Sequence, residues 1–298
     1  MSLSSKVGVN PLPWVLTQDG FDLSIATLSV AFPAIVAAGF DAVHADIPEG
    51  MPASDYRKLL ADHGLRAAPG YFAAHFDTRE NFNQTLDAAR RHAAGQAELG
   101  LTEAFFASHL NPARIAAPAV GAGFDAGTFD LVVDQMAQTA AVITAEGITP
   151  CLHPHVGSWV ETEAEVRRVL DSIDPAHLSF GPDTGHLFWA GIDPAAIIAD
   201  YADRVRAVHI KDVHRDAAER ARQRHADYAE TVYAENVWTE PGQGDVNFER
   251  TLAALQVGYD GWFVCEVDNP DRKSKEESTA LSARWVARQQ PAGEDVPS

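Results

Sequence analysis

Histidine, aspartate and glutamate residues gather in four short segments in the second half of the chain. The segments are His153-Pro154-His155, Asp183-Thr184-Gly185-His186, His209-Ile210-Lys211-Asp212 and Glu266-Val267-Asp268. Imidazole nitrogens and carboxylate oxygens are suitable ligands for divalent cations such as Mn²⁺, Co²⁺, Mg²⁺ or Zn²⁺. No Cys-x-x-Cys pair accompanies them in the sequence, which argues against a structural zinc site. If the fold brings these segments together, they predict a site for one divalent metal ion.

Each of these residues also has an ordinary structural interpretation when it is taken alone. Asp183 could simply cap a helix, and His209 could be a hydrogen-bonded structural residue. Glu266 follows the apolar run Phe263-Val264-Cys265, and a carboxylate beside such a strand needs a partner because an unpaired buried charge is very costly. Either a salt bridge or a metal ion would supply that partner. The occurrence of all four segments at strand ends favours the metal.

The elements that must position these residues are short apolar runs that alternate with helical patterns. The predicted strands are Lys6–Val9, Ala42–Asp46, Arg66–Phe72, Glu103–Ala107, Thr149–His153, Leu178–Asp183, Val205–His209 and Trp262–Val267. Between them, Phe129–Glu146 has apolar residues at helical spacing, and Thr162 precedes two glutamates as at a helix start. Such alternation implies parallel strands with right-handed crossovers. Eight units favour an α/β fold with a single (β/α)₈ barrel, comprising residues 1–298 as one domain.

In a barrel of this kind, the C-terminal ends of the strands form the active-site face, and all four segments lie there. Trp14 and Phe72 fall near the same face, where aromatic rings can pack against sugars, although either could equally be a core residue. A long insertion, His214–Gly244, follows the seventh strand and has a partly helical centre. It could cover the pocket or form a subunit contact. The polar tail Pro291–Ser298 is expected to be frayed.

Composition restricts the classes of partner. The chain has 298 residues, 46% of them hydrophobic, and a formal net charge of -19. That charge disfavours nucleic acid and anionic membranes as partners. The two cysteines are too few for a disulfide framework, and the first residues do not resemble a signal peptide, so a cytoplasmic location is expected. No apolar run is long enough to predict a transmembrane helix.

Longer motifs in the second half resemble those of the xylose isomerase-like superfamily of barrels. They are Phe180-Gly181-Pro182-Asp183-Thr184-Gly185-His186, Val208-His209-Ile210-Lys211-Asp212-Val213, Gly242-Gln243-Gly244-Asp245-Val246-Asn247-Phe248 and Gly258-Tyr259-Asp260-Gly261-Trp262-Phe263-Val264-Cys265-Glu266. The resemblance implies a metal held by a Glu, an Asp, a His and a second Glu. Asp183, His209 and Glu266 match the last three positions.

The position of the first glutamate is where this chain departs from the family pattern. Either Glu161 reaches back to the metal, or His153 replaces the carboxylate. We favour Glu161, because a carboxylate preserves the charge of the site. His153 and His155 would then contact the substrate, together with Trp14 and Phe72.

The resemblance implies a metal-dependent isomerase or epimerase that enolises a small ketose or keto-polyol. A ligating carboxylate, Glu161 or Glu266, would act as the base, while His186 and Lys211 would supply acid or orienting groups. The His-Pro-His-Val-Gly and Asn-Pro-Leu-Pro-Trp segments are more similar to the inosose dehydratase branch, so a carbon–oxygen lyase using the same enolisation is the alternative.

Two further hypotheses for a barrel of this kind are a non-catalytic sugar-binding protein and a DNA-repair endonuclease. The acidic net charge disfavours the endonuclease. Barrels of this kind are often homo-oligomers, and the same is an open expectation for this chain.

Overall fold

The computed structural model describes residues 3–17 and 20–290. Eight parallel strands form a closed barrel, and the third of them is divided into two segments, β5 and β6. The strands are β1 (Val7–Val9), β4 (Ala42–His44), β5 (Arg66–Ala68), β6 (Tyr71–Ala74), β7 (Glu103–Ser108), β8 (Thr149–Leu152), β9 (Ser179–Phe180), β10 (Ala207–Ile210) and β13 (Trp262–Cys265). Two sheets, β10-β13-β1-β4-β5 and β6-β7-β8-β9, make up the wall, and parallel bridges at Phe180–Val205 and Asp183–His209 join them between β9 and β10. Each predicted strand therefore overlaps an observed one, and the predicted barrel is confirmed.

The third barrel strand is interrupted by a kink, and a buried glutamine side chain bridges it. β5 pairs with β4, whereas β6 pairs with β7, so the chain changes partner at Pro69-Gly70. The Gln96 side chain accepts from Gly70 N at 2.9 Å and donates to Ala45 O at 2.9 Å. A side chain at Gly70 would collide with the Ala45 carbonyl and with Gln96 itself. The glutamine amide thus supplies the hydrogen bonds that the interrupted ladder lacks.

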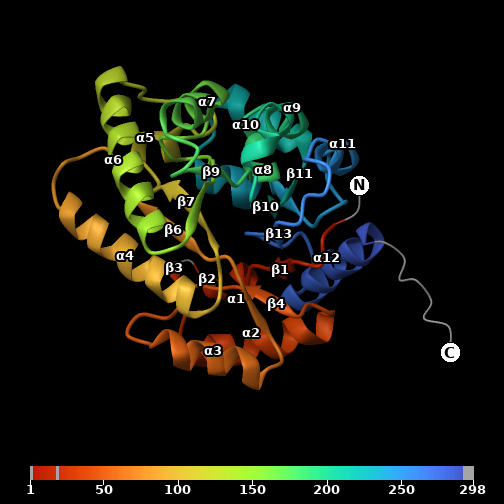
Figure 1. The fold of residues 1–298 in the computed structure, drawn as a ribbon. Helices are drawn as coiled ribbons and strands as arrows, with labels where there is room; N and C mark the ends of the chain where they lie inside the picture. The colour runs from red at the N-terminus through yellow and green to blue at the C-terminus, as the bar shows by residue number, and fades with distance from the viewer. Residues whose placement is uncertain (1–2, 18–19, 291–298) are drawn as a thin grey trace.

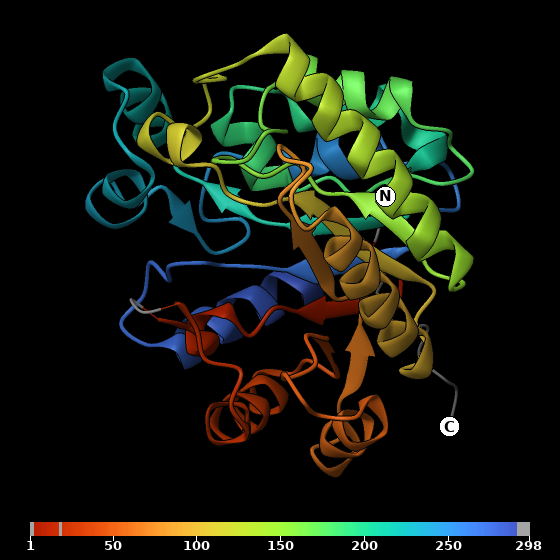
Figure 2. The same ribbon diagram turned by 90° about the vertical axis from the view of Figure 1, so that its left-hand side faces the viewer.

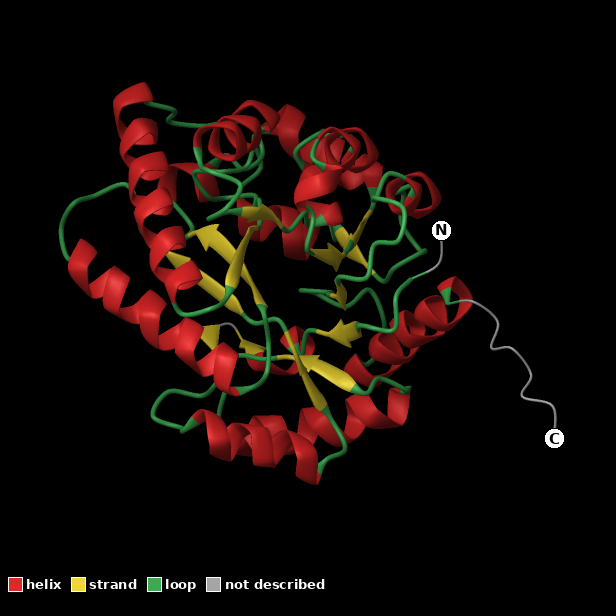
Figure 3. Cartoon of the chain, in the orientation of Figure 1, coloured by secondary structure: helices red, strands yellow, loops and turns green. Residues whose placement is uncertain are grey.

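Helices surround the barrel, as Figures 1 and 3 show. The outer helices are α2 (Ile25–Ala38), α3 (Ala53–Asp62), α4 (Phe82–Glu98), α6 (Ala126–Ala145), α7 (Glu163–Ser172), α9 (Pro194–Asp200), α11 (Phe248–Ala253) and α12 (Lys275–Gln289). The helix predicted at Phe129–Glu146 corresponds to α6. The start predicted at Thr162 is a capping box, in which Thr162 and Glu165 satisfy each other's backbone N–H groups.

Short elements decorate the C-terminal ends of the strands. They are α1 (Leu12–Val15), the hairpin β2 (Leu16–Thr17) and β3 (Gly20–Phe21), α5 (Pro112–Ala116) and α8 (Thr184–Trp189). A 3₁₀ turn (Ala202–Arg204) lies instead between α9 and the start of β10. The insertion after β10 begins and ends in an antiparallel pair, β11 (Asp212–Val213) with β12 (Trp238–Thr239). Between them lie α10 (Arg215–Arg224) and a π-helix (Glu230–Ala234), which project past the strand ends in Figure 2. The tail Pro291–Ser298 lies outside the described residues.

Within the described residues, no helix combines the length and the apolar character needed to cross a lipid bilayer.

Replacing Gln96 by leucine should destabilise the barrel, because Gly70 N–H and Ala45 C=O would lose their partner while staying buried. Each orphaned group costs about 1–3 kcal/mol of unfolding free energy. Urea denaturation of Gln96→Leu measures the loss, and Gln138→Leu on the exposed side of α6 is the matched control. Equal midpoints for the two variants would show that the bridge is dispensable.

Candidate active site

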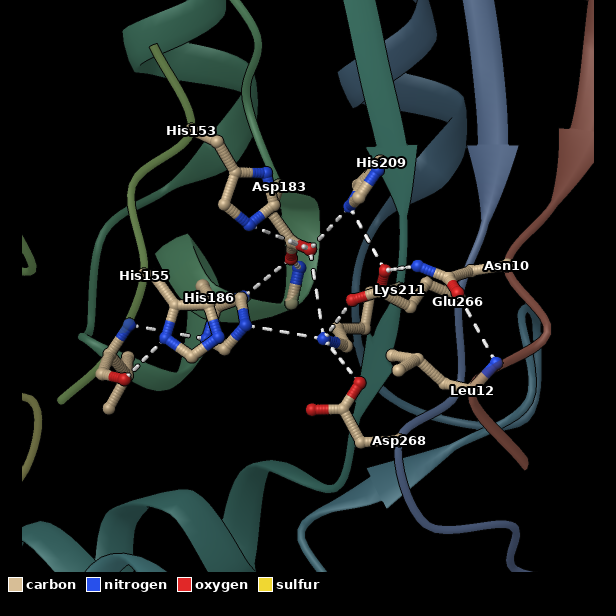
Figure 4. Close-up of polar contacts among 12 residues, drawn as sticks. Asn10, Leu12, His153, His155, Asp183, His186, His209, Lys211, Glu266 and Asp268 are labelled. Carbon is tan, nitrogen blue, oxygen red and sulfur yellow. Dashed lines mark hydrogen bonds and ion pairs between the residues drawn. The ribbon is translucent and has the colours of Figure 1, made fainter. Parts of the chain in front are cut away.

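Three potential metal ligands converge at the ends of neighbouring strands. Asp183, His209 and Glu266 follow or end β9, β10 and β13, and all three are buried. His209 Nδ1 lies 3.5 Å from Asp183 Oδ2 and 3.3 Å from Glu266 Oε2. One ligand atom from each residue falls within 4.8 Å of the others. Figure 4 shows the three side chains pointing toward one another.

The hydrogen bonding of these residues fits a metal ion. Asp183 Oδ1 accepts from Gly185 N and His186 N, both at 2.8 Å, and so caps α8. Its other oxygen has no hydrogen-bond partner, and neither ring nitrogen of His209 has one. Buried polar atoms without partners are rare because they forfeit their solvation. A divalent cation among these atoms would satisfy them. Asp183 therefore serves as a helix cap and still presents a free oxygen to the cluster.

His153 occupies the fourth corner of this cluster. Its Nε2 atom lies 3.9 Å from Asp183 Oδ2, and its Nδ1 atom has no hydrogen-bond partner. His153, Asp183 and His186 form a second group whose ligand atoms lie within 4.8 Å of one another. Burial, reinforced by the neighbouring His209, lowers the pKa of His153 well below its usual range, so the ring is neutral and able to ligate.

Glu161 is engaged elsewhere, which corrects the expectation that it reaches the metal and acts as the base. Its two oxygens accept from Arg114 Nη1 at 3.0 Å and from three backbone N–H groups, those of Ala119, Gly121 and Gly157, at 2.8–2.9 Å. The reason is that Arg114 is fully buried and requires carboxylate partners, which Glu161 and Glu165 provide. Glu161 therefore ties the loop after β8 to the connection 108–127.

Lys211 lies inside the site and is fully buried. Its Nζ atom is 2.5 Å from Glu266 Oε1, 2.7 Å from Asp268 Oδ1 and 3.2 Å from His186 Nε2. It also lies 4.5 Å from the centroid of the Trp238 ring. Burial alone would lower the pKa of Lys211, but the surrounding carboxylates hold it well above its usual value, so the side chain is an ammonium.

The site retains an excess of negative charge. Asp183, Glu266 and Asp268 face the single ammonium of Lys211. Burial tends to raise the pKa of Glu266, yet Lys211 holds it well below its usual range. For Asp268, burial prevails over Lys211 and raises the pKa to about 7. Because three carboxylates outnumber one ammonium, a divalent cation would balance the cluster.

The cluster opens into a pocket of about 280 Å³. Polar groups on its wall include Asp46, Tyr71, His155 and Tyr228, and apolar residues line the rest, namely Leu12, Leu16, Phe21, Leu110, Ala229 and Val232. Among the described lining residues there is no lysine or arginine. Tyr228, Ala229, Val232 and Tyr233 come from the insertion. The insertion therefore covers the pocket, one of the two roles that the sequence left open.

Two aromatic residues predicted to bind substrate do not line this pocket. Phe72 packs against Phe106 and against His92 of α4, on the outer side of the barrel. Its neighbour Tyr71 points inward, with its ring 5.2 Å from that of His153, because successive strand residues face opposite sides. Trp14 is buried within α1, and Leu12 lines the pocket instead.

The two other predicted histidines form a stack beside the cluster. His155 lines the pocket, and its ring centroid is 3.8 Å from that of His186 behind it. His155 Nδ1 lies 2.7 Å from Val156 O, and burial lowers the pKa of His155 to about 4, so the ring is neutral at pH 7. His186 contacts Lys211 and the Trp238 ring rather than the pocket.

The predicted site residues do not include Asn10, Tyr71, Tyr228 or Asp268, although Asn10, Tyr71 and Asp268 stand at strand ends that the sequence places on the active-site face. Asn10 Nδ2 donates to Glu266 Oε2 at 2.6 Å and so orients this carboxylate. Asp268 had a usable signal, since it lies two residues after Glu266 and so shares its face of the chain. No local pattern marked Tyr228, which lies in a short helical turn directly before the π-helix of the insertion.

Comparison with known proteins agrees with this geometry. The family model for xylose isomerase-like TIM barrels matches residues 32–289. The chain belongs to this family. A curated relative, an inosose dehydratase of Geobacillus thermodenitrificans (strain NG80-2), is 27% identical over 294 residues, which cover 95% of this chain and 96% of the relative.

Two solved structures share the fold. A D-allulose 3-epimerase from Methylomonas sp., in complex with D-allulose, superposes with a TM-score of 0.68 at 17% identity over 97% of this chain and 100% of the other. A xylose isomerase-like TIM barrel protein from Mycobacterium smegmatis, in complex with magnesium, has a TM-score of 0.68 at 18% identity over 95% of each chain.

Removing the His153 imidazole should weaken metal binding at least about tenfold, since even the loss of partners outside the coordination shell costs that much. Titration of metal-free His153→Ala with Mn²⁺ or Co²⁺ measures the affinity. His177→Ala, at an exposed position, is the control. Unchanged affinity in His153→Ala would exclude His153 as a ligand.

Replacing Glu161 should instead damage stability. Glu161→Ala leaves Arg114 buried with one carboxylate fewer and should lower the unfolding free energy by about 3–5 kcal/mol. At saturating metal the folded variant should still bind one ion per chain. Glu163→Ala removes only an exposed i,i+4 pair with Arg167 and should cost less than about 1 kcal/mol. Loss of the metal with stability intact would reinstate Glu161 as a ligand.

Proposed function

We propose that this protein is a metal-dependent dehydratase that removes water from an uncharged cyclic keto-polyol of the inosose type. The observation that carries the proposal is the buried Asp183–His209–Glu266 cluster at the floor of a small pocket. The near-full-length similarity to an inosose dehydratase supports the lyase reading over the isomerase or epimerase reading that the sequence pattern favoured. Both reactions begin with enolisation, so the same cluster suits either.

Asp183, His209, Glu266 and His153 would hold the metal in this proposal. A bound divalent cation supplies Lewis acidity, which polarises a carbonyl and makes the neighbouring C–H bond more acidic. Glu266 lines the pocket, and Lys211 keeps it ionised, so this carboxylate is available to accept the α-proton. Asn10 fixes its orientation through the 2.6 Å hydrogen bond.

As the C–O bond breaks, negative charge builds on the oxygen of the departing β-hydroxyl. This oxygen therefore needs polar groups beside it in the pocket. Asp268 lines the pocket and contacts the Lys211 ammonium, and His186 contacts that ammonium from behind. This hydrogen-bonded row places a positive charge beside the pocket without exposing it. We assign Asp268 the role of general acid in this row. Burial raises its pKa to about 7, so part of the protein carries a protonated Asp268 near neutral pH. That proton would pass to the departing oxygen, which leaves as water, while Glu266 holds the α-proton.

The charge of the pocket supports an uncharged substrate. A phosphate or carboxylate group would meet Asp46, Glu266 and Asp268, and among the described lining residues it would find no arginine or lysine to pair with. The ammonium of Lys211, the one found close to the pocket in the described part of the chain, is already held by two carboxylates. At about 280 Å³ the pocket suits a ligand the size of one sugar ring.

The test follows the two chemical steps separately. The metal-loaded protein is incubated in heavy water with a keto-inositol and with a panel of ketoses, and both α-proton exchange and product mass are followed. Exchange on the keto-inositol with a product lighter by one water is the expected result. Exchange on a ketose with a product that loses no water, and that is heavier than the substrate only by the incorporated deuterium, would instead establish an isomerase or epimerase. Metal binding with no exchange on any compound would indicate a non-catalytic binding barrel.

Changing Glu266 to glutamine should abolish turnover, at least about 100-fold in kcat, because the amide cannot accept the α-proton and ligates metal poorly. Circular dichroism should show a folded barrel. Glu249→Gln, at an exposed position on α11, is the control and should be fully active. Near-normal activity of Glu266→Gln would remove Glu266 from the mechanism.

A further inference from the structure

One tyrosine of the insertion after β10, Tyr228, lies on the wall of the pocket. Tyr228 precedes the π-helix Glu230–Ala234 and lines the pocket together with Glu266, Asp268 and His155. Its ring lies parallel to that of His155, with 6.3 Å between centroids and 13° between planes. It also lies 5.1 Å from the Trp189 ring of α8. Two aromatic neighbours therefore fix its position.

A glycine leaves room for this ring. Gly157 has φ +89°, and a Cβ atom there would lie 3.3 Å from Tyr228 Cδ2 and 3.1 Å from Leu110 Cδ2. Both its backbone conformation and this close approach suit glycine better than other residues. The loop after β8 thus supports the tyrosine on a further side, and the side chain is held in place before any ligand arrives.

The hydroxyl of Tyr228 is uncommitted, because it makes no hydrogen bond with any described residue. Burial, followed by the negative charge of Asp268, raises the pKa of Tyr228 well above its usual value, so the group keeps its proton. A protonated hydroxyl on a pocket wall, with no partner in the protein, is available to donate to a ligand.

We propose that Tyr228 is a substrate-recognition residue that donates a hydrogen bond to one ring hydroxyl of the cyclic polyol. The inference rests on the proposed function. The neighbouring wall groups Asp46, Glu266 and Asp268 are carboxyl groups that mainly accept hydrogen bonds. A substrate hydroxyl that donates to one of them keeps lone pairs that can accept from Tyr228. A ring with hydroxyls around its whole edge satisfies both kinds of partner at once, whereas a deoxy analogue leaves the tyrosine unpaired.

The test compares Tyr228→Phe with Tyr201→Phe. The first change removes only the hydroxyl and keeps the ring contacts with His155 and Trp189. The second removes a hydroxyl that donates to Asp171 at 2.8 Å, at a residue that does not line the pocket. Calorimetry with inositol, which lacks the carbonyl and cannot react, gives the Kd of each metal-loaded protein. Metal content and circular dichroism confirm that each variant is intact.

The Kd of Tyr228→Phe should rise about three- to tenfold, the range of one neutral hydrogen bond, and that of Tyr201→Phe should not change. The KM for the keto-inositol should rise in parallel. If the wild type binds inositol and Tyr228→Phe binds it equally well, the inference is wrong and the proposed function stands. If the wild type binds no cyclic polyol and exchanges protons only on open-chain ketoses, the proposed function is wrong and the inference falls with it.

Discussion

The carboxylate of Asp183 connects the fold of this protein to its chemistry, because its two oxygens belong to different structures. One oxygen caps α8 and fixes where the helix begins. The other faces His209 and His153 without a hydrogen bond. The parallel bridge between Asp183 and His209 also closes the barrel between β9 and β10. Asp183 thus completes the barrel wall and also presents one carboxylate oxygen to the cluster. The position of the cluster therefore follows from closure of the barrel.

Lys211 sets the electrostatics around that carboxylate. A buried ammonium is stable only with anionic partners, and the carboxylates of Glu266 and Asp268 supply them. The same contacts hold Glu266 ionised and pair the ammonium of Lys211, so no unpaired cation remains among the described residues that line the pocket. The ionised carboxylate and the lack of free positive charge are therefore two results of one ion cluster.

The sequence predicted the barrel and the convergence of Asp183, His209 and Glu266 because both depend on local patterns. Alternating apolar runs locate the strands, and the residue just after a buried strand must lie on the active-site face, which places Asp183, His209 and Glu266. The side of the strand on which Phe72 and Tyr71 lie was not predictable, because a parallel strand in a barrel is apolar on both faces. Glu161 was misassigned because its partner Arg114 lies 47 positions away, a separation that no local pattern reveals. Tyr228 escaped notice for a similar reason, since only the folded insertion brings it to the pocket.

Gly157 links two parts of the molecule that would otherwise be independent. Its N–H group donates to Glu161 at 2.8 Å, within the buried network of Arg114, while its missing side chain makes room for Tyr228. A substitution at this residue would disturb the folding of the loop and the shape of the pocket together. A substitution at residue 157 that altered the specificity of the pocket would also lower the stability of the barrel. This position is therefore constrained in the evolution of new ligand specificities. Ala229 and Val232, which line the pocket with no hydrogen-bonded side chain, are the freer positions from which a new specificity could evolve.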